Sequence, residues 1–233
     1  MRRFGVLAAT GSAMASAPGT AAGAADGAPV QRACLDGGLV RDLRGREAHG
    51  PQWLGFAEGD IVVVSGLPGG GKSTLIKRAA QDRGIDSQDV RERWERRMPD
   101  LLPYTAYRPL VRIAHYWGLW RTLRSGASAV VHDCGTQTWV RALLATAARR
   151  RGRALHLVLL DTTPDEALAG QEARGRGVST YAFARHRAAV DRLLRAAEAG
   201  RLPAGCTSAI LLDRSSASRV TRIAFRAPGT PAA

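Results

Sequence analysis

The sequence has few cysteines, almost no lysine and no long apolar run, and the first and the last of these shortages each exclude a class of protein. Its three cysteines, Cys34, Cys134 and Cys206, are odd in number and far apart, with no CxxC or Cys/His cluster. This pattern argues against a disulfide scaffold or a thiolate metal centre and favours reduced thiols. No stretch approaches the roughly 18 apolar residues that a membrane span needs. The sequence therefore predicts a cytoplasmic protein with no membrane partner.

Positive charge is in excess, and arginine carries nearly all of it. The chain of 233 residues has 34 basic and 20 acidic residues, for a net charge of +14, yet lysine occurs only at positions 72 and 77. Such a balance suits an acidic partner such as a nucleotide, a nucleic acid or a phosphorylated substrate. A GC-rich genome that codes arginine in place of lysine explains the same excess. Charge therefore supports an anionic ligand without choosing one.

One short apolar segment runs directly into a glycine-rich turn. Residues 61–65 are mostly β-branched, which is typical of a buried strand, and residues 73–80 have the pattern of a helix. The turn between them fits G-x-x-x-x-G-K-[ST], with the strand and the helix as the expected context. The predicted phosphate-binding residues are Gly66, Leu67, Pro68, Gly69, Gly70, Gly71, Lys72, Ser73 and Thr74.

This spacing has a chemical reason. Glycines let backbone N–H groups close around a phosphate, and the start of the following helix directs its unpaired amides and positive dipole end at the same place. Lys72 is expected to reach the β- and γ-phosphates, and the Ser73 hydroxyl is expected to bind Mg²⁺. Because the chain otherwise uses arginine, a lysine at this position indicates a need for a compact ammonium.

The rest of the chain alternates between strand and helix patterns. Strands are expected at residues 61–65, just after Gly84, and at 128–133, 154–161 and 208–213, with a short edge strand at 39–43. Helices are expected at 109–125, opened by Pro109, at 136–150, from 164, at 181–199 and near 216–225, while Trp53, Leu54 and Phe56 pack on the sheet. The pattern predicts an α/β three-layer fold with a mainly parallel five-stranded sheet, covered on both faces.

Composition marks off the two ends of the chain. Residues 1–33 are rich in Ala, Gly, Ser and Pro and predict a disordered or mis-started leader. Arg2 and Arg3 before a short apolar run leave a weak export signal open, although an exported protein would find no ATP. Residues 34–226 are expected to form one domain, and residues 227–233 a flexible tail.

Two further features lie outside the phosphate loop. Asp133 ends the strand at 128–133, where a carboxylate beside a phosphate loop can organise Mg²⁺. The segment 91–121 is basic and aromatic, with Arg91, Tyr104, Arg108 and Arg112 as candidate substrate contacts. Within it, Leu110, Ile113, Trp117 and Trp120 recur at helical spacing. This stripe is expected to pack in the core, with a wall of the substrate site as the alternative.

Four motifs in this order resemble a known family. They are the phosphate loop, Asp86-x-x-x-x-Arg91, the strand ending in Val130-Val-His-Asp133, and Arg174-Gly-Arg176. Together they make residues 58–215 similar to the small P-loop kinases, and most of all to the AAA_33, zeta-toxin and polynucleotide 5′-kinase-like group.

The resemblance implies a role for each matched residue. Lys72 and Ser73 would hold a nucleoside triphosphate, ATP or GTP, with Mg²⁺, and Asp133 would match the acid at the end of the second strand. Arg174, with Arg176 as a second candidate, would match the arginine of a lid at about 173–180. The family acid three residues before an arginine falls here on Gln88. Asp86, expected at the end of its strand, is therefore the candidate base.

Two functions follow from this set. The first is transfer of the γ-phosphate of ATP·Mg²⁺ to a hydroxyl acceptor, with Lys72, Asp86, Asp133, Arg174 and Arg176 as the catalytic group. A nucleoside, a nucleic-acid end or another small molecule could be the acceptor. The alternative is a regulatory module that binds or hydrolyses ATP or GTP without a small-molecule acceptor.

Overall fold

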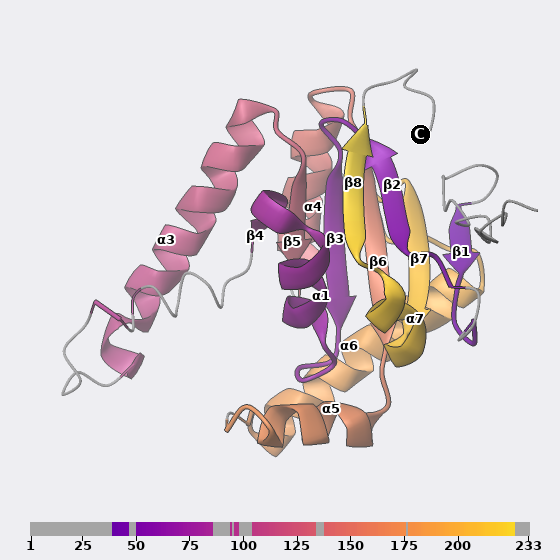
Figure 1. The fold of residues 1–233 in the computed structure, drawn as a ribbon. Coiled ribbons are helices and arrows are strands. Elements are labelled where there is room, and N and C mark those ends of the chain that lie inside the picture. The colour runs from indigo at the N-terminus through magenta and orange to yellow at the C-terminus, as the bar shows by residue number, and fades with distance from the viewer. Residues whose placement is uncertain are drawn as a thin grey trace, which may run out of the picture.

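The centre of the fold is a six-stranded sheet in which every pair of neighbours is parallel (Figure 1). The computed structural model describes residues 39–46, 50–85, 94, 96–97, 104–133, 138–175 and 177–226. In spatial order the strands are β1 (Val40–Asp42), β7 (Ser208–Asp213), β6 (Leu155–Asp161), β3 (Ile61–Gly66), β5 (Ala129–His132) and β4 (Gly84–Ile85).

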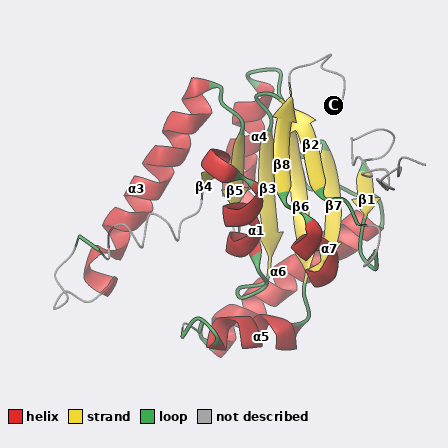
Figure 2. Cartoon of the chain, viewed as in Figure 1, coloured by secondary structure: helices red, strands yellow, loops and turns green. Residues whose placement is uncertain are grey.

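Helices connect these strands, as parallel pairing requires. They are α1 (Lys72–Ala79), the 3₁₀ helix η1 (Gln81–Arg83), α3 (Tyr104–Ser125), α4 (Thr138–Arg149), α5 (Pro164–Glu172), α6 (Thr180–Glu198) and α7 (Arg214–Arg219). Figure 2 shows helices in front of the sheet and behind it.

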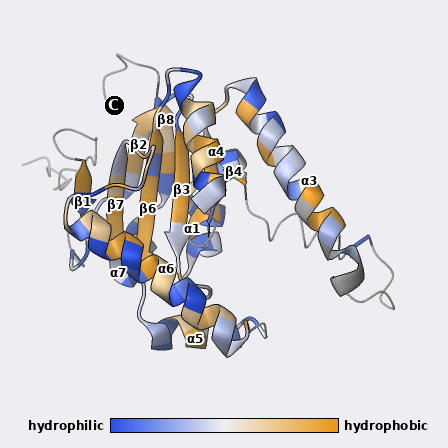
Figure 3. Ribbon diagram, turned by 180° about the vertical axis from the view of Figure 1, so that it is seen from behind, coloured by the Kyte–Doolittle hydropathy of each residue, from blue (hydrophilic) through white to orange (hydrophobic). Residues whose placement is uncertain are grey.

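Alternation along the central strand divides the core into two layers. Ile61 and Val63 point to the face covered by α4 and α6, which Figure 3 shows from behind. Val62 and Val64 point to the opposite face, which α1, α7 and a separate two-stranded sheet cover. All four side chains are fully buried, as expected for a parallel strand with both faces covered.

The structure confirms the α/β class and the mainly parallel sheet, but the expected number of strands is wrong. The short β1 extends the sheet to six strands, and two further strands, β2 (Trp53–Ala57) and β8 (Arg222–Arg226), pair with each other. The expected helix near 216–225 ends at Arg219 instead. Because β2 and β8 lie far apart in the sequence, local patterns do not indicate their pairing.

The long helix α3 differs most from expectation. It begins at Tyr104 rather than at Pro109, which lies inside it. The stripe predicted to be buried is exposed: the exposed fractions are Leu110 49%, Ile113 65%, Trp117 63% and Trp120 44%.

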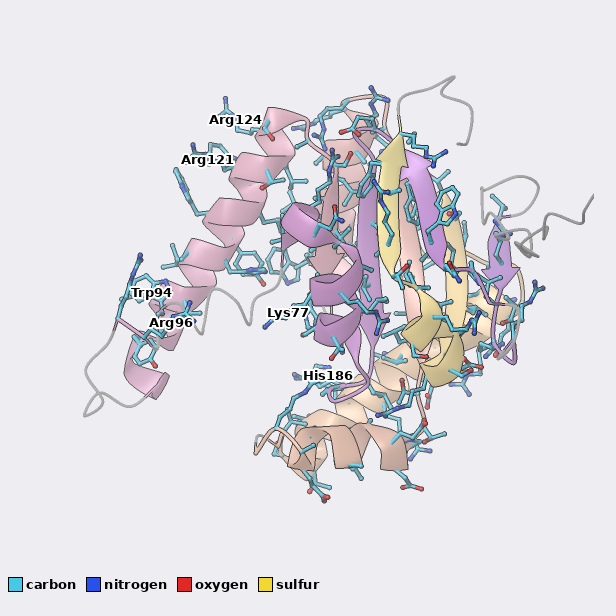
Figure 4. The ribbon with its side chains drawn as sticks, in the orientation of Figure 1. Lys77, Trp94, Arg96, Arg121, Arg124 and His186 are labelled. Carbon is cyan, nitrogen blue, oxygen red and sulfur yellow. The ribbon has the colours of Figure 1, made fainter. Side chains whose placement is uncertain are left out.

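A second apolar stripe on α3 is buried in its place. It comprises Tyr107, Val111, Leu119 and Leu123. A helix with two apolar stripes can pack either stripe against the rest of the protein. The spacing of apolar residues alone therefore does not indicate which stripe is buried. Figure 3 shows α3 standing apart from the sheet, and Figure 4 shows Arg121 and Arg124 pointing away from it. The interpretation of the four exposed residues as core is therefore wrong.

None of the helices in the described ranges is both long and apolar enough to cross a membrane.

A buried polar network joins β6, β7 and the residue before β3 at the amino end of the sheet. The two ring nitrogens of His156 lie 2.8 Å from the Ser208 hydroxyl and 3.0 Å from Asp60 Oδ2. Burial alone would raise the pKa of Asp60, but hydrogen bonds from His156 and from the backbone of Ala154 and Ala57 lower that pKa below its ordinary value. The ionised form of Asp60 therefore stabilises the fold.

Asp60→Asn should destabilise the protein in a pH-dependent way. At pH 7 we expect the free energy of unfolding to fall by about 1–3 kcal/mol, because the amide nitrogen of asparagine cannot accept and would leave buried donors unsatisfied. Since the folded-state pKa is depressed, the contribution is present above the unfolded pKa of about 3.9 and is lost as pH falls through the folded value. Urea unfolding at pH 7 and pH 3.5 measures both quantities, with the exposed Asp165→Asn as control. An equal loss at both pH values would contradict stabilisation by the ionised carboxylate of Asp60.

Candidate functional site

The candidate site lies at the carboxyl end of β3, where the chain turns into α1. In the sheet, β3 stands between β6 and β5, so the turn is flanked by two other strand ends. Figure 2 shows this turn as a loop between β3 and α1. It contains the residues predicted to bind phosphate, in a position where parallel α/β sheets place their ligands.

The first turn of α1 has no side-chain cap. Its N-cap residue is Gly71, which has a left-handed backbone with φ of 91° and makes no capping hydrogen bond. By contrast, side chains of Thr163, Ser179 and Asp213 cap α5, α6 and α7. The amides at the start of a helix have no intrahelical partner, and the helix dipole makes this end positive. An anion is the partner that such an end favours.

Lys72 lies against the loop that it follows. Its Nζ donates hydrogen bonds to the carbonyl oxygens of Gly66, at 2.8 Å, and Leu67, at 2.7 Å. Only 3% of Lys72 and 6% of Ser73 is exposed, whereas Thr74 is exposed. The ammonium and the Ser73 residue are therefore held at the same turn as the uncapped amides.

Helix α5 and the residue that follows β6 support the other side of the loop. Gly69 has φ of 89°, and a Cβ added there would overlap the carbonyl oxygen of Ala167. Thr162 donates from Oγ1 to the carbonyl of Gly70 at 3.3 Å. Gln171 donates from Nε2 to the carbonyl of Pro68 at 3.1 Å. Backbone contact and two side chains thus fix the loop in place.

Asp133 follows β5, the strand beside β3, and its amide donates to the carbonyl of Val64 at 2.9 Å. Its carboxylate forms a 2.7 Å ion pair with Arg141 of α4. The two side chains are only 5% and 7% exposed, so this pair is almost dry. Burial raises the pKa of the nearby Cys206 thiol to about 11, so this cysteine is a poor nucleophile.

The residues present fit a hard cation bound together with phosphates. Among the described residues, no group of three His, Cys, Asp or Glu side chains could hold a metal by itself. A hydroxyl at Ser73 and a carboxylate at Asp133 are the oxygen donors that Mg²⁺ prefers, with phosphate oxygens and water completing the shell. Such a shell suits a metal that arrives with a nucleotide.

The predicted lid begins where α5 ends. Arg174 is exposed, its amide donates to the carbonyl of Gln171, and Gly175 follows with φ of 61°. The chain then enters α6, whose N-cap is Ser179. The amide of Val178 donates to Oε1 of Gln171 at 2.9 Å. One exposed arginine is therefore carried by a segment that is tied to α5.

The carboxyl ends of β6 and β7 are closed by residues that follow β1. Arg44 pairs with Asp161 at 2.6 Å and with Glu198 at 2.8 Å. The amide of Gly45 donates to Asp213 at 2.6 Å. Burial would raise the pKa of Asp213, but hydrogen bonds from Gly45, Ser216 and Ser215 lower it to about 2. The acids at the carboxyl ends of β6 and β7 are therefore already paired.

Several predicted site residues are not placed. Asp86, Arg91 and Arg176 lie outside the described residues, as does Gln88. Tyr104, Arg108 and Arg112 lie on α3, whose backbone is described at these positions although their side chains are not. The structure brings together the phosphate loop, Lys72 and Ser73, and places Asp133 at the end of the neighbouring strand.

Sequence reasoning missed three residues around the loop. Thr162 and Gln171 contact it from β6 and α5, and Arg141 neutralises Asp133. Gln171 and Arg141 are polar residues at buried positions of helices, which is the one signal that the sequence offered. That signal is visible only once the buried face of each helix is known.

Comparison with known proteins identifies the family. Residues 61–200 match AAA_33, described as an AAA domain, and the chain belongs to this family. It is a P-loop kinase-like nucleotide-binding protein, as the motifs predicted. Among solved structures, it is similar to a protein from Chloroflexus aurantiacus J-10-fl described as a "putative kinase". The two are 19% identical over 66% of this chain and 87% of that chain, with a TM-score of 0.43. Comparison with curated proteins gave no match.

Gly69→Ala should displace the phosphate loop. A left-handed alanine costs about 1 kcal/mol on its own, and overlap with the Ala167 carbonyl should add about 1–3 kcal/mol of unfolding free energy. Gly200→Ala is the matched control, because Gly200 has φ of 69° and open space around it. Denaturant unfolding of both variants separates the two effects. Equal losses would show that α5 does not press on the loop.

Proposed function

We propose that this protein transfers the γ-phosphate of ATP, bound with Mg²⁺, to a hydroxyl group of an acceptor. The observation that carries the proposal is the uncapped first turn of α1 beside the buried ammonium of Lys72. Amides and an ammonium at one turn match a polyphosphate in charge and in geometry. Phosphoryl transfer depends mainly on positioning and charge neutralisation, which such a site can supply.

Lys72 would act by exchanging partners. Its two carbonyl acceptors are neutral, whereas phosphate oxygens are anionic, and charge-assisted hydrogen bonds are the stronger kind. A β- or γ-phosphate entering the loop would therefore draw the ammonium away from Gly66 and Leu67. ATP is the triphosphate proposed here, with GTP as the alternative.

Ser73 and Asp133 would hold the metal that accompanies the nucleotide. Mg²⁺ in such sites neutralises charge that develops on the transferring group. Ser73 would supply a direct hydroxyl ligand. Asp133, whose carboxylate already pairs with Arg141, would contact the metal through water. This division fits a cation that keeps several of its waters.

The residues proposed to bind the acceptor come from the sequence motifs. Asp86 would orient the acceptor hydroxyl and take its proton, and Arg91, Tyr104, Arg108 and Arg112 would surround the acceptor. Arg174, with Arg176, would place positive charge on the transferring phosphoryl group, as an arginine finger in cis does. A nucleoside, a nucleic-acid end or another small molecule with a hydroxyl would fit this charge.

One sequence feature favours a second function. The family acid is replaced by Gln88, which cannot accept a proton, and Asp86 lies two residues away from that position. Without a base, the same loop would serve a module that binds or slowly hydrolyses ATP or GTP. Labelled-phosphate transfer to nucleosides, oligonucleotide ends and sugars would separate the two, because hydrolysis without any labelled acceptor supports the module.

Lys72→Ala should abolish stabilisation by ATP·Mg²⁺. A ligand at 100 times its Kd adds about 2.7 kcal/mol to the free energy of unfolding, and thermal melting with and without ATP·Mg²⁺ measures this shift. Lys77→Ala is the matched control, since it removes the other lysine of the chain from the same helix. Figure 4 shows Lys77 projecting from α1 on the side that faces α3. If Lys72→Ala keeps the full shift, the loop does not hold the nucleotide as proposed.

Asp86→Asn should remove phosphate transfer while sparing nucleotide binding. The amide keeps the size of the carboxylate but cannot take a proton, so we expect a loss of about 100-fold or more in transfer rate. The thermal shift with ATP·Mg²⁺ should be unchanged. Asp89→Asn tests the neighbouring acid in the same assays. Normal transfer by Asp86→Asn would show that this residue is not the base.

A further inference from the structure

Gln171 lies between the phosphate loop and the start of α6, and it contacts both. Only 6% of the residue is exposed. Its Nε2 donates to the carbonyl of Pro68 at 3.1 Å, and its Oε1 accepts from the amide of Val178 at 2.9 Å. One amide group therefore connects two segments that are distant in the sequence.

The surrounding contacts give this bridge a rigid base. Backbone atoms of α5 touch the loop, since a Cβ added at Gly170 would overlap the carbonyl oxygen of Gly69. Figure 1 shows α5 beside the turn that ends β3. The segment on the other side of the bridge leaves α5 at the exposed Arg174 and Gly175. The phosphate loop and Arg174 are thus linked through the C-terminal turn of α5.

We propose that Gln171 is a positioning residue that couples occupancy of the phosphate loop to the placement of Arg174. The inference rests on the proposed nucleotide site and adds a coupling to it. Phosphate in the loop fixes the carbonyl of Pro68, which orders Gln171, and Gln171 in turn holds Val178. Because only three residues separate Arg174 from Val178 in the sequence, holding one restricts the other.

The chemistry of glutamine fits this task. A primary amide offers a donor and an acceptor on one planar group, and the two contacts use one of each. Gln171→Glu keeps the acceptor for Val178 but loses the donor to Pro68. Gln171→Met keeps the length and apolar volume of the side chain and loses both bonds. The two variants therefore distinguish the hydrogen bond to Pro68 from the hydrogen bond to Val178.

The first measurement is amide exchange in the full chain, with and without saturating ATP·Mg²⁺. In the wild type, nucleotide should slow exchange both at the loop and at Arg174, Gly175 and Val178. In Gln171→Met and Gln171→Glu, the loop should still be protected at saturation, while the protection at these three amides should fall about tenfold. Glu172→Ala, an exposed neighbour on α5, should behave as the wild type.

The second measurement is a double-mutant cycle on nucleotide affinity. Gln171→Met and Arg174→Ala should each weaken ATP·Mg²⁺ binding about tenfold, and the double variant should be no weaker than Arg174→Ala. If Gln171 acted on the loop independently of Arg174, the two losses would be additive, about 100-fold together. Non-additivity is thus a readout that a purely structural role would not produce.

The outcomes distinguish this inference from the proposed function. If the wild type gains no protection and no thermal shift from ATP·Mg²⁺, the proposed function fails and the coupling fails with it. If the wild type binds the nucleotide while Gln171→Met keeps full protection at Arg174, Gly175 and Val178, only the coupling is overturned. Additive losses in the cycle overturn it as well.

Discussion

The first turn of α1, which has no side-chain cap, is the constraint on which the candidate site depends. Three other helices begin with a side chain that accepts from the first turn, whereas Gly71 leaves that turn of α1 open. The positive dipole end of a helix favours an anion at such a position. This helix start has no side-chain cap. It is held in place by the tight turn, by the hydrogen bonds of Lys72 and by contacts from α5.

The site was predictable where it is contiguous in sequence and unpredictable where it is not. Strand, turn and helix of the phosphate loop follow one another within residues 61–79, so local rules of backbone geometry were sufficient. Thr162, Ala167 and Gln171 reach the loop only after β6 has paired with β3. Their contribution depends on strand order, which periodicity does not encode. For the same reason, the sequence did not indicate that β2 pairs with β8 or which face of α3 is buried.

The acids along the carboxyl edge of the sheet are paired on both sides of the phosphate loop. Arg44 and Gly45 occupy the carboxyl ends of β6 and β7, and the resulting cluster of acids is already satisfied. On the other side, Asp133 and Arg141 form a dry pair beside β3. An incoming anion therefore meets neutralised acids on both flanks and positive charge at the turn itself. This arrangement explains how an acid-bearing edge can face a polyphosphate.

The pairing of β2 with β8 has a consequence for how the chain is made. The carbonyl of Gln52 accepts a hydrogen bond from Thr221, 169 positions later. While a ribosome extends the chain from the amino end, the apolar side chains of residues 53–57 must wait for residues 222–226 before their strand gains its neighbour. Until then an unpaired edge stays available to other chains. The interval before β8 is made is thus one in which a nascent molecule is exposed to aggregation.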